Sequence, residues 1–109
     1  MAKTIEFTYE DKDYVLEFTK RTVKQMEGTG FSLDKLADKP MTYLPELFKG
    51  AFLVHHKEVK QEKIAEIYSH LTDKEGLIGK LMEIYNDPIN AMMDEPTEEE
   101  KKVNWKANF

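Results

Sequence analysis

The chain has 109 residues, no cysteine and a net charge of −5 at pH 7, from 21 acidic and 16 basic side chains. A domain of this length can bury roughly two thirds of its unfolded surface, and without cysteine it has no disulfides, thiolate metal sites or cysteine nucleophiles. The negative charge disfavours nucleic acid and membrane surfaces as partners. With no signal sequence and no run of about 18 apolar residues, we expect a cytoplasmic protein.

Residues 3–9 and 14–18 alternate apolar and polar side chains with period two, which predicts an antiparallel β-hairpin with a loop over residues 10–13. This register places six apolar residues on one face, in the pairs Tyr9–Tyr14, Phe7–Leu16 and Ile5–Phe18. Because a two-stranded ribbon is marginal alone, this face must pack on helices or on another subunit. Both edges of the ribbon are expected to be uncovered, which leaves strand addition between protomers open.

Two short helices are predicted after the hairpin. Thr19 is expected to cap the first, over residues 20–27, and the sequence Gly-Thr-Gly at 28–30 ends it. We interpret these glycines as a helix C-terminus, because a phosphate loop also needs a further Gly and a Lys followed by Ser or Thr. Ser32 is expected to cap a single turn that carries Leu36.

Residues 42–56 hold the longest concentration of apolar side chains and are predicted to form the central helix. Pro45 fits only in the first turn of this helix. Gly50 indicates either the close approach of another element or simple tolerance. Because the apolar surface runs almost all round, two outcomes are open. Either the helix is wholly buried and binding occurs elsewhere, or a flank around Phe52 and His56 stays exposed for a second protomer or a client helix.

Helical periodicity returns after the charged run 57–63 and predicts a helix that ends at Leu71. Thr72 and Glu75 form a capping box that is expected to open a longer helix. The Asp-Pro pair at 87–88 is expected to interrupt that helix. The residues that follow would form either a separate short helix or a kinked continuation.

The sequence changes character at residue 94, where the run DEPTEEEKK has no apolar periodicity. Such a run cannot bury enough surface to offset the entropy of ordering, so residues 94–109 are predicted to be an acidic linker and a flexible aromatic tail. Residues 1–93 form one α+β, mostly helical domain, with the hairpin packed on about four to five helices. The simpler interpretation of Trp105 is that it folds back on the domain. The alternative is that the tail enters a partner's groove or sheet.

No arrangement of residues in the sequence indicates catalysis or a cofactor. The three histidines lack the i, i+4 spacing of a helical zinc site, and no Ser/His/Asp set or dinucleotide motif occurs. We expect no enzyme activity, no metal and no cofactor. Methionine adapts to irregular apolar partners. Met26 and Met82 are expected in the core, whereas Met92 and Met93 adjoin the tail as a candidate exposed strip.

Several stretches together resemble a family of small phage and prophage proteins of Gram-positive bacteria. They are AKTIEFTYEDKDYVLEFTKRTVKQME near the start, KPMTYLPELFKGAFLVHH in the middle, EIYSHLTDK and LMEIYNDPINAMM later, and VNWKANF at the end. Proteins of that family are encoded in the tail module and are similar to the tail assembly chaperones of long-tailed phages. The resemblance spans nearly the whole chain, and its motifs are structural rather than catalytic.

The resemblance implies a non-enzymatic chaperone in the host cell that binds apolar helical segments of the tape measure protein before the tail tube polymerises. The tape measure protein, and also the tail tube protein, are the expected partners. The candidate protein-binding residues are Phe52, His56, Met92, Met93, Trp105 and Phe109. Two other functions stay open, a small phage-encoded protein that sequesters a host protein and a minor structural component of the tail. A homo-oligomer also stays open.

Overall fold

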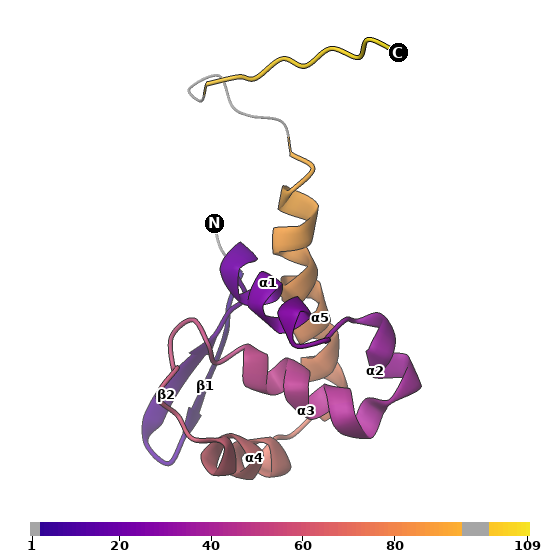
Figure 1. Cartoon of the computed structure of the whole chain (residues 1–109). Helices are drawn as coiled ribbons and strands as arrows, with labels where there is room; N and C mark the ends of the chain where they lie inside the picture. Colours follow the sequence, from indigo (N-terminus) through magenta and orange to yellow (C-terminus); the bar gives the residue numbers. More distant parts are fainter. Residues whose placement is uncertain (1–2, 95–100) are drawn as a thin grey trace.

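The computed structural model describes residues 3–94 and 101–109 (Figure 1). In these residues a two-stranded antiparallel sheet is followed by five helices, which confirms the α+β, mostly helical class with an N-terminal hairpin. The hairpin lies at one side of the body, and the helices make up the rest. In chain order the elements are β1 (Ile5–Tyr9), β2 (Lys12–Leu16), α1 (Lys20–Gly28), α2 (Asp34–Asp38), α3 (Pro40–Gly50), α4 (Gln61–His70) and α5 (Lys74–Ala91).

The hairpin closes through a two-residue turn rather than the predicted four-residue loop. Phe7 lies opposite Tyr14, so the pairing differs by two residues from the predicted register. Both turn residues, Glu10 and Asp11, have a positive φ, of 50° and 65°. A turn of this kind matches the right-handed twist of the strands, which a longer loop need not do. Because a shift of two residues keeps every side chain on its face, the predicted apolar face is still correct.

The central helix is shorter than predicted. α3 spans Pro40–Gly50, with Pro45 in its interior rather than in its first turn. Residues 51–55 continue as tight turns, with backbone hydrogen bonds between residues three apart, instead of extending the helix to His56. The predicted end is wrong because the turns are as apolar as the helix, so hydrophobicity alone does not mark where the helix stops.

The segment after α3 holds the hairpin against the helices. Val15 donates its backbone N–H to Nε2 of His56 at 2.9 Å, and Glu17 donates its N–H to the carbonyl of Ala51 at 3.1 Å. The backbone groups of Val15 and Glu17 point away from β1, since alternate residues of an antiparallel pair face outward. These bonds therefore cover the outer edge of β2, and the prediction that both ribbon edges are uncovered is wrong for this strand.

The core is built around Phe48 and Phe52, which are almost completely buried between the hairpin and the helices. Their ring centroids lie 5.1 Å apart, and the ring of Phe7 on β1 lies 6.4 Å from each of them. Edge-on and offset contacts of this kind add to the effect of burial. A Cβ at Gly50 would collide with the side chain of Met26 on α1. Of the two interpretations of Gly50, close approach is therefore the correct one.

The predicted helix ends are right for α1 and wrong for α2. The hydroxyl of Thr19 accepts the N–H of Thr22 at 3.2 Å and caps α1 as predicted. Gly30 has a φ of 96°, in the left-handed region that favours glycine, just after α1 ends. The predicted Ser32 cap is wrong, because the N-cap of α2 is Leu33 and no side chain caps this short helix.

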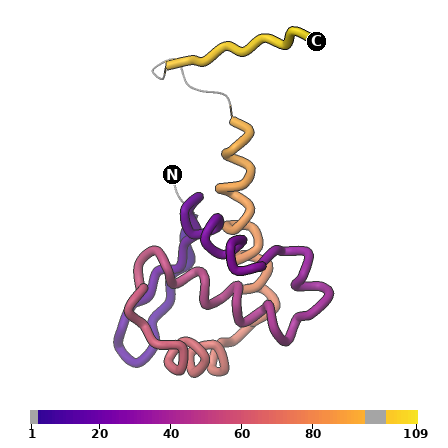
Figure 2. Tube along the Cα trace, viewed as in Figure 1, coloured from indigo at the N-terminus to yellow at the C-terminus, as the bar shows by residue number. Residues whose placement is uncertain are grey.

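α5 is the longest helix among the described residues, and it begins one residue later than predicted. The carboxylate of Asp73 accepts the N–H of Gly76 at 3.2 Å, so Asp73 caps the helix in place of the predicted box of Thr72 and Glu75. The helix then runs through Pro88 as one element, so of the two predicted outcomes the separate short helix is wrong and the chain continues as helix. Packing of its buried side offsets the missing hydrogen bond. α5 lies against α1 and α3, and its C-terminal end projects beyond the body (Figure 2).

We expect Phe48→Ala to lower the free energy of unfolding by roughly 3 to 5 kcal/mol, because it leaves a cavity at a fully buried site. Urea denaturation monitored by circular dichroism measures this loss. Met41→Ala is the control, since Met41 on α3 is strongly exposed and its replacement should change the free energy by no more than about 0.5 kcal/mol. A loss below about 1 kcal/mol for Phe48→Ala would contradict the central position of this ring.

Candidate functional site

The six residues predicted to bind a partner do not form one site. They lie in the body, at the end of α5 and in the C-terminal segment, as the pairs Phe52 and His56, Met92 and Met93, and Trp105 and Phe109. Phe52 is only 1% exposed, so the idea of a free flank around it is wrong. The apolar face of the hairpin packs there instead. Binding has to be sought at the other two places.

His56 has a structural role, because its side chain binds the backbone of the hairpin. Its Nε2 accepts the N–H of Val15 at 2.9 Å, and its ring centroid lies 5.1 Å from that of Tyr14. Burial lowers the pKa of His56 below the ordinary value of 6.5, because the charged imidazolium would lose hydration. The neutral ring keeps the lone pair that the Val15 bond requires. His56 is therefore a hydrogen-bond acceptor that holds β2.

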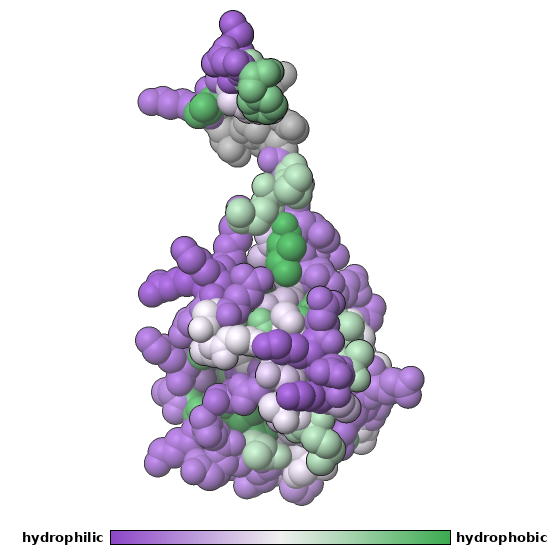
Figure 3. Space-filling model, turned by 45° about the vertical axis from the view of Figure 1, so that its right-hand side comes forward, coloured by the Kyte–Doolittle hydropathy of each residue, from purple (hydrophilic) through white to green (hydrophobic). Residues whose placement is uncertain are grey.

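Four apolar side chains form an exposed strip along α5 and the turn after it, here called the α5 stripe: Met82, Ile89, Met92 and Met93. Their exposed fractions are 36%, 39%, 70% and 85%. Residues seven positions apart lie within about 20° of one another around a helix, so Met82 and Ile89 are in line, and Met92 and Met93 continue the strip in the turn that follows α5. Figure 3 shows apolar surface on the narrow neck between the body and the C-terminal segment.

The packing of α5 explains why the stripe is exposed. The buried side of the helix carries Leu81, Ile84, Tyr85 and Pro88. Past Pro88 none of the described residues of the chain is buried, although Ala91 is partly covered, so the end of the helix is largely exposed to water. The N–H groups of the last two stripe residues still donate to carbonyls three residues earlier, each at 3.1 Å. The stripe therefore keeps a helical shape to its end.

Charged side chains flank the α5 stripe. Lys3 Nζ lies 3.4 Å from a carboxylate oxygen of Asp87 and 3.6 Å from one of Glu83, and the hydrogen bond with Asp87 raises the pKa of Lys3. A hollow of about 570 Å³ lies between α5 and residues 17–20, and its border includes the carboxylates of Glu17, Asp87 and Asp94 and the ammonium groups of Lys3 and Lys20. The surface beside the stripe is therefore of mixed charge.

The C-terminal segment, residues 101–109, is extended and makes no helix or strand, and each of its residues is exposed (Figure 1). Trp105 is 84% exposed and Phe109 is fully exposed. The interpretation that Trp105 folds back on the domain is therefore wrong. The predicted acidic linker falls largely on residues 95–100, which lie outside the described residues.

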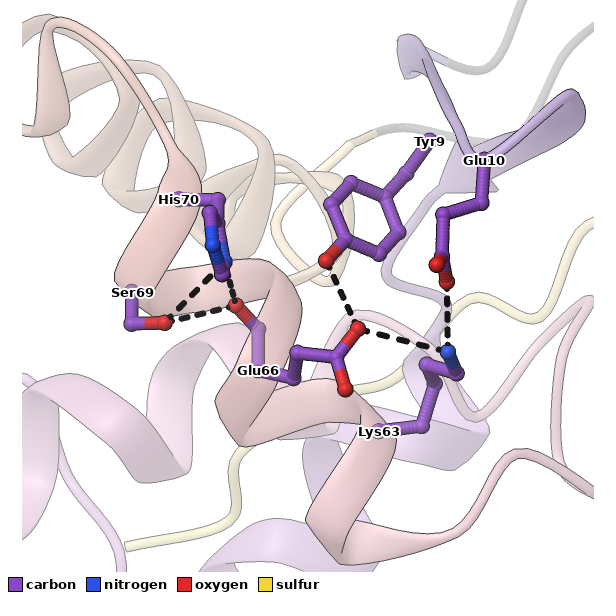
Figure 4. Close-up of polar contacts among 6 residues, drawn as sticks. All are labelled: Tyr9, Glu10, Lys63, Glu66, Ser69 and His70. Carbon is purple, nitrogen blue, oxygen red and sulfur yellow. Dashed lines mark hydrogen bonds and ion pairs between the residues drawn. The ribbon is translucent and has the colours of Figure 1, made fainter.

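A cluster of polar side chains joins the tip of the hairpin to α4 (Figure 4). The hydroxyl of Tyr9 donates to a carboxylate oxygen of Glu66 at 2.6 Å. Lys63 Nζ donates to Glu10 at 2.7 Å and to the same oxygen of Glu66 at 3.3 Å. The contacts of Tyr9 with Glu66 and of Lys63 with Glu10 link residues more than fifty positions apart, so the cluster fixes the hairpin on α4.

The same cluster is not suited to acid–base catalysis. The hydrogen bond with Glu66 raises the pKa of Tyr9 to about 12, and the hydrogen bond with Glu10 raises the pKa of Lys63. The bond from Tyr9 lowers the pKa of Glu66. At neutral pH the phenol and the ammonium therefore hold their protons and the carboxylate holds its charge, so none of the three is poised to exchange a proton.

Two further properties of the described residues bear on function. In residues 3–94 and 101–109 no three His, Asp or Glu side chains are arranged to hold a metal ion. No helix in this part of the chain combines the length and the apolar character needed to cross a membrane.

Sequence reasoning missed Met82 and Ile89 as surface residues, and the expectation that Met82 lies in the core is wrong. Both belong to the α5 stripe and are more than a third exposed. The signal that would have found them is their spacing of seven residues, which places both on one line of a continuous helix. Because the helix was expected to be interrupted at Pro88, residues on the two sides of Pro88 were not placed on one helical surface.

Comparison with known proteins gives a family and no function. The family model described as "Domain of unknown function (DUF5055)" matches residues 1–109. The chain therefore belongs to this family over its full length. No curated protein matches the chain, and no solved structure matches it either.

We expect the stability of the protein to depend on pH through His56. Its folded-state pKa lies below 6.5, so the unfolded chain takes up the proton first as the pH falls. The contribution of His56 is therefore fully present above about pH 6.5 and is lost as the pH falls toward the folded pKa. Urea midpoints at about pH 7.5 and about pH 5.5 measure this loss.

The variant His56→Gln tests this assignment, because its amide oxygen can accept the Val15 bond without titrating. Its urea midpoint should fall less than that of the wild type over the same pH range. His70→Gln on exposed α4 leaves the Val15 bond in place and should fall as much as the wild type. If the urea midpoint decreased equally in His56→Gln and in the wild type, His56 would be ruled out as the source of the pH dependence.

Proposed function

We propose that this member of the family is a non-enzymatic phage tail assembly chaperone, which binds apolar helical segments of the tape measure protein before the tail tube polymerises. The observation that carries the proposal is the α5 stripe, an exposed line of Met and Ile on a projecting helix end. The resemblance of the sequence to proteins of the phage tail module supports it. The host cytoplasm is the proposed location, and the tail tube protein is a further candidate partner.

The shape of the stripe favours a helical client. A narrow line of apolar side chains on a helix end can pack beside the apolar face of a second helix. Three of its four members are methionines. Because Met is unbranched and polarizable, it fits irregular apolar surfaces without a fixed sequence. Such a surface suits a long client that presents many different apolar segments.

The size of the stripe predicts weak, reversible binding. Complete burial of an apolar side chain is worth about 1.5 to 3 kcal/mol, and the four members are already covered to different degrees. Association itself costs an estimated 4 to 15 kcal/mol, so one stripe can supply only a small net affinity. Several copies bound along one client would add through avidity. Weak single contacts also let tail tube subunits displace the chaperone.

Charge favours a basic client. Lys3 pairs with both Glu83 and Asp87 beside the stripe, so the charge that a client meets is mainly the net charge of −5 on the whole chain. A client helix with basic residues beside its apolar face is therefore favoured. The same net charge keeps the chaperone soluble while it holds an apolar segment.

Co-expression with a tape measure fragment from the same genome tests the proposal. We expect the wild-type chain to keep the fragment in the soluble fraction. The double variant Met92→Asp/Met93→Asp should lose this effect and weaken binding at least tenfold, because burial of the new carboxylates costs free energy. Met41→Asp is the matched control, since Met41 is an equally exposed methionine far from the stripe on α3.

Circular dichroism should show that the double variant and the control are both folded, because all three methionines are exposed. Equal solubility of the fragment with the wild type and the double variant would remove the stripe from the mechanism. No gain in solubility with the wild-type chain would overturn the proposed function itself.

A further inference from the structure

The outer edge of β1 carries backbone groups that no described residue uses. Glu6 lies opposite Val15 in the ladder, and the N–H of Val15 points outward to His56. In an antiparallel pair both members of such a position face away from each other. The N–H and C=O groups of Glu6 and Thr8 therefore point outward from β1, and in residues 3–94 and 101–109 they form no hydrogen bond. β2 is covered by the segment after α3, but β1 is an open edge.

The apolar face of the hairpin is also incompletely covered at β1. Ile5, Phe7 and Tyr9 are partly buried, whereas Tyr14 and Leu16 of β2 are almost completely buried. Tyr9 also borders a hollow together with Tyr14, Val59 and Lys63, so only part of its exposure lies toward the open edge. A third strand at this edge would complete both the hydrogen bonding and the apolar face.

The C-terminal segment has the pattern of such a strand. Apolar and polar residues alternate strictly from residue 102 to the end of the segment, with the apolar ones at Val103, Trp105, Ala107 and Phe109. This period of two is typical of a strand with one buried face. The segment is already extended and has no partner strand in the structure.

We propose that residues 101–109 of one copy add as a third strand to the outer edge of β1 in a second copy, and that two copies exchange these segments reciprocally. The product is a closed dimer in which each edge is occupied by the partner's C-terminal segment. The proposal concerns contacts between two identical chains and does not rest on the tape measure protein as a client.

The two faces of the segment match those of β1. Residues directly opposite each other in neighbouring strands share a face. When Trp105 and Phe109 join the partly buried side chains of β1, Lys102 and Lys106 come to lie on the side of Glu6. Their opposite charges favour this arrangement over the flipped one, which would expose both aromatic rings and place the lysines over the core.

Exchange between copies explains why the C-terminal segment does not pack on the body of its own chain. Its residues are all exposed and lie away from the body (Figure 1). The ion pair of Lys3 with Asp87 at 3.4 Å places the second half of α5 beside the start of β1. Two Trp and two Phe side chains would together bury roughly 600 to 1,000 Å², and with the strand backbones the area approaches that of a specific interface.

The mass of the full chain in solution tests the proposal. By light scattering coupled to size-exclusion chromatography, we expect twice the chain mass of 12.8 kDa. Trp105→Asp should give a monomer, or at least a tenfold weaker dimer, and its body should remain folded because Trp105 is exposed. Asn104→Ser alters a neighbouring residue on the polar face and should remain dimeric. A monomeric wild type, or a Trp105→Asp variant that dimerises as well as the wild type, would overturn the proposal.

A mixing experiment shows which parts pair. Thr8→Pro removes the outward N–H of β1 and leaves the backbone hydrogen bonds to β2 in place, although it also removes the bond of the Thr8 hydroxyl to Asp13 at 2.6 Å. The Thr8→Pro chain and a chain lacking residues 101–109 should each be monomeric alone. Mixed in equal amounts, they should form a heterodimer, because one supplies the intact segment and the other the intact edge. Two monomers in the mixture, with circular dichroism showing both chains folded, would contradict the assigned contact.

Discussion

The fold depends on burial of the hairpin's apolar face against Phe48 and Phe52. A two-stranded ribbon is marginally stable alone, and here the ring of Phe7 contacts both phenylalanines. The backbone of β2 is fixed by His56 and by Ala51, which belong to the same short segment after α3. One stretch of chain therefore supplies the core and closes a sheet edge, and this leaves no apolar flank there for a partner.

Because the apolar side chains of the body pack against one another, most of the large exposed apolar side chains lie near the C-terminal end of the chain. The α5 stripe and the C-terminal segment are both outside the core, so they can change partners without unfolding it. The two proposals also support each other physically. A dimer formed by strand exchange would carry two α5 stripes, and two weak sites on one particle bind a long client more tightly than either alone.

The sequence was sufficient for the fold class, the apolar face of the hairpin and the cap at Thr19, because each rests on local periodicity or a local hydrogen bond. The sequence was insufficient where tertiary packing determines the local structure. The turn at Glu10 and Asp11 sets a register that alternation alone leaves open. Pro88 does not break α5, because the helix is held by its buried side. Of the candidate site, the exposure of Met92 and Met93 was foreseen, whereas the burial of Phe52 required the full fold.

The most direct test of the binding surface uses the methionines as probes. A tape measure fragment from the same genome is titrated into protein with isotope-labelled methionine methyl groups, observed by NMR. We predict that the methyl signals of Met82, Met92 and Met93 change, while buried Met26 and exposed Met41 keep their positions. Changes at Met41 or Met26, with the three α5 stripe signals unmoved, would contradict binding at the projecting end of α5.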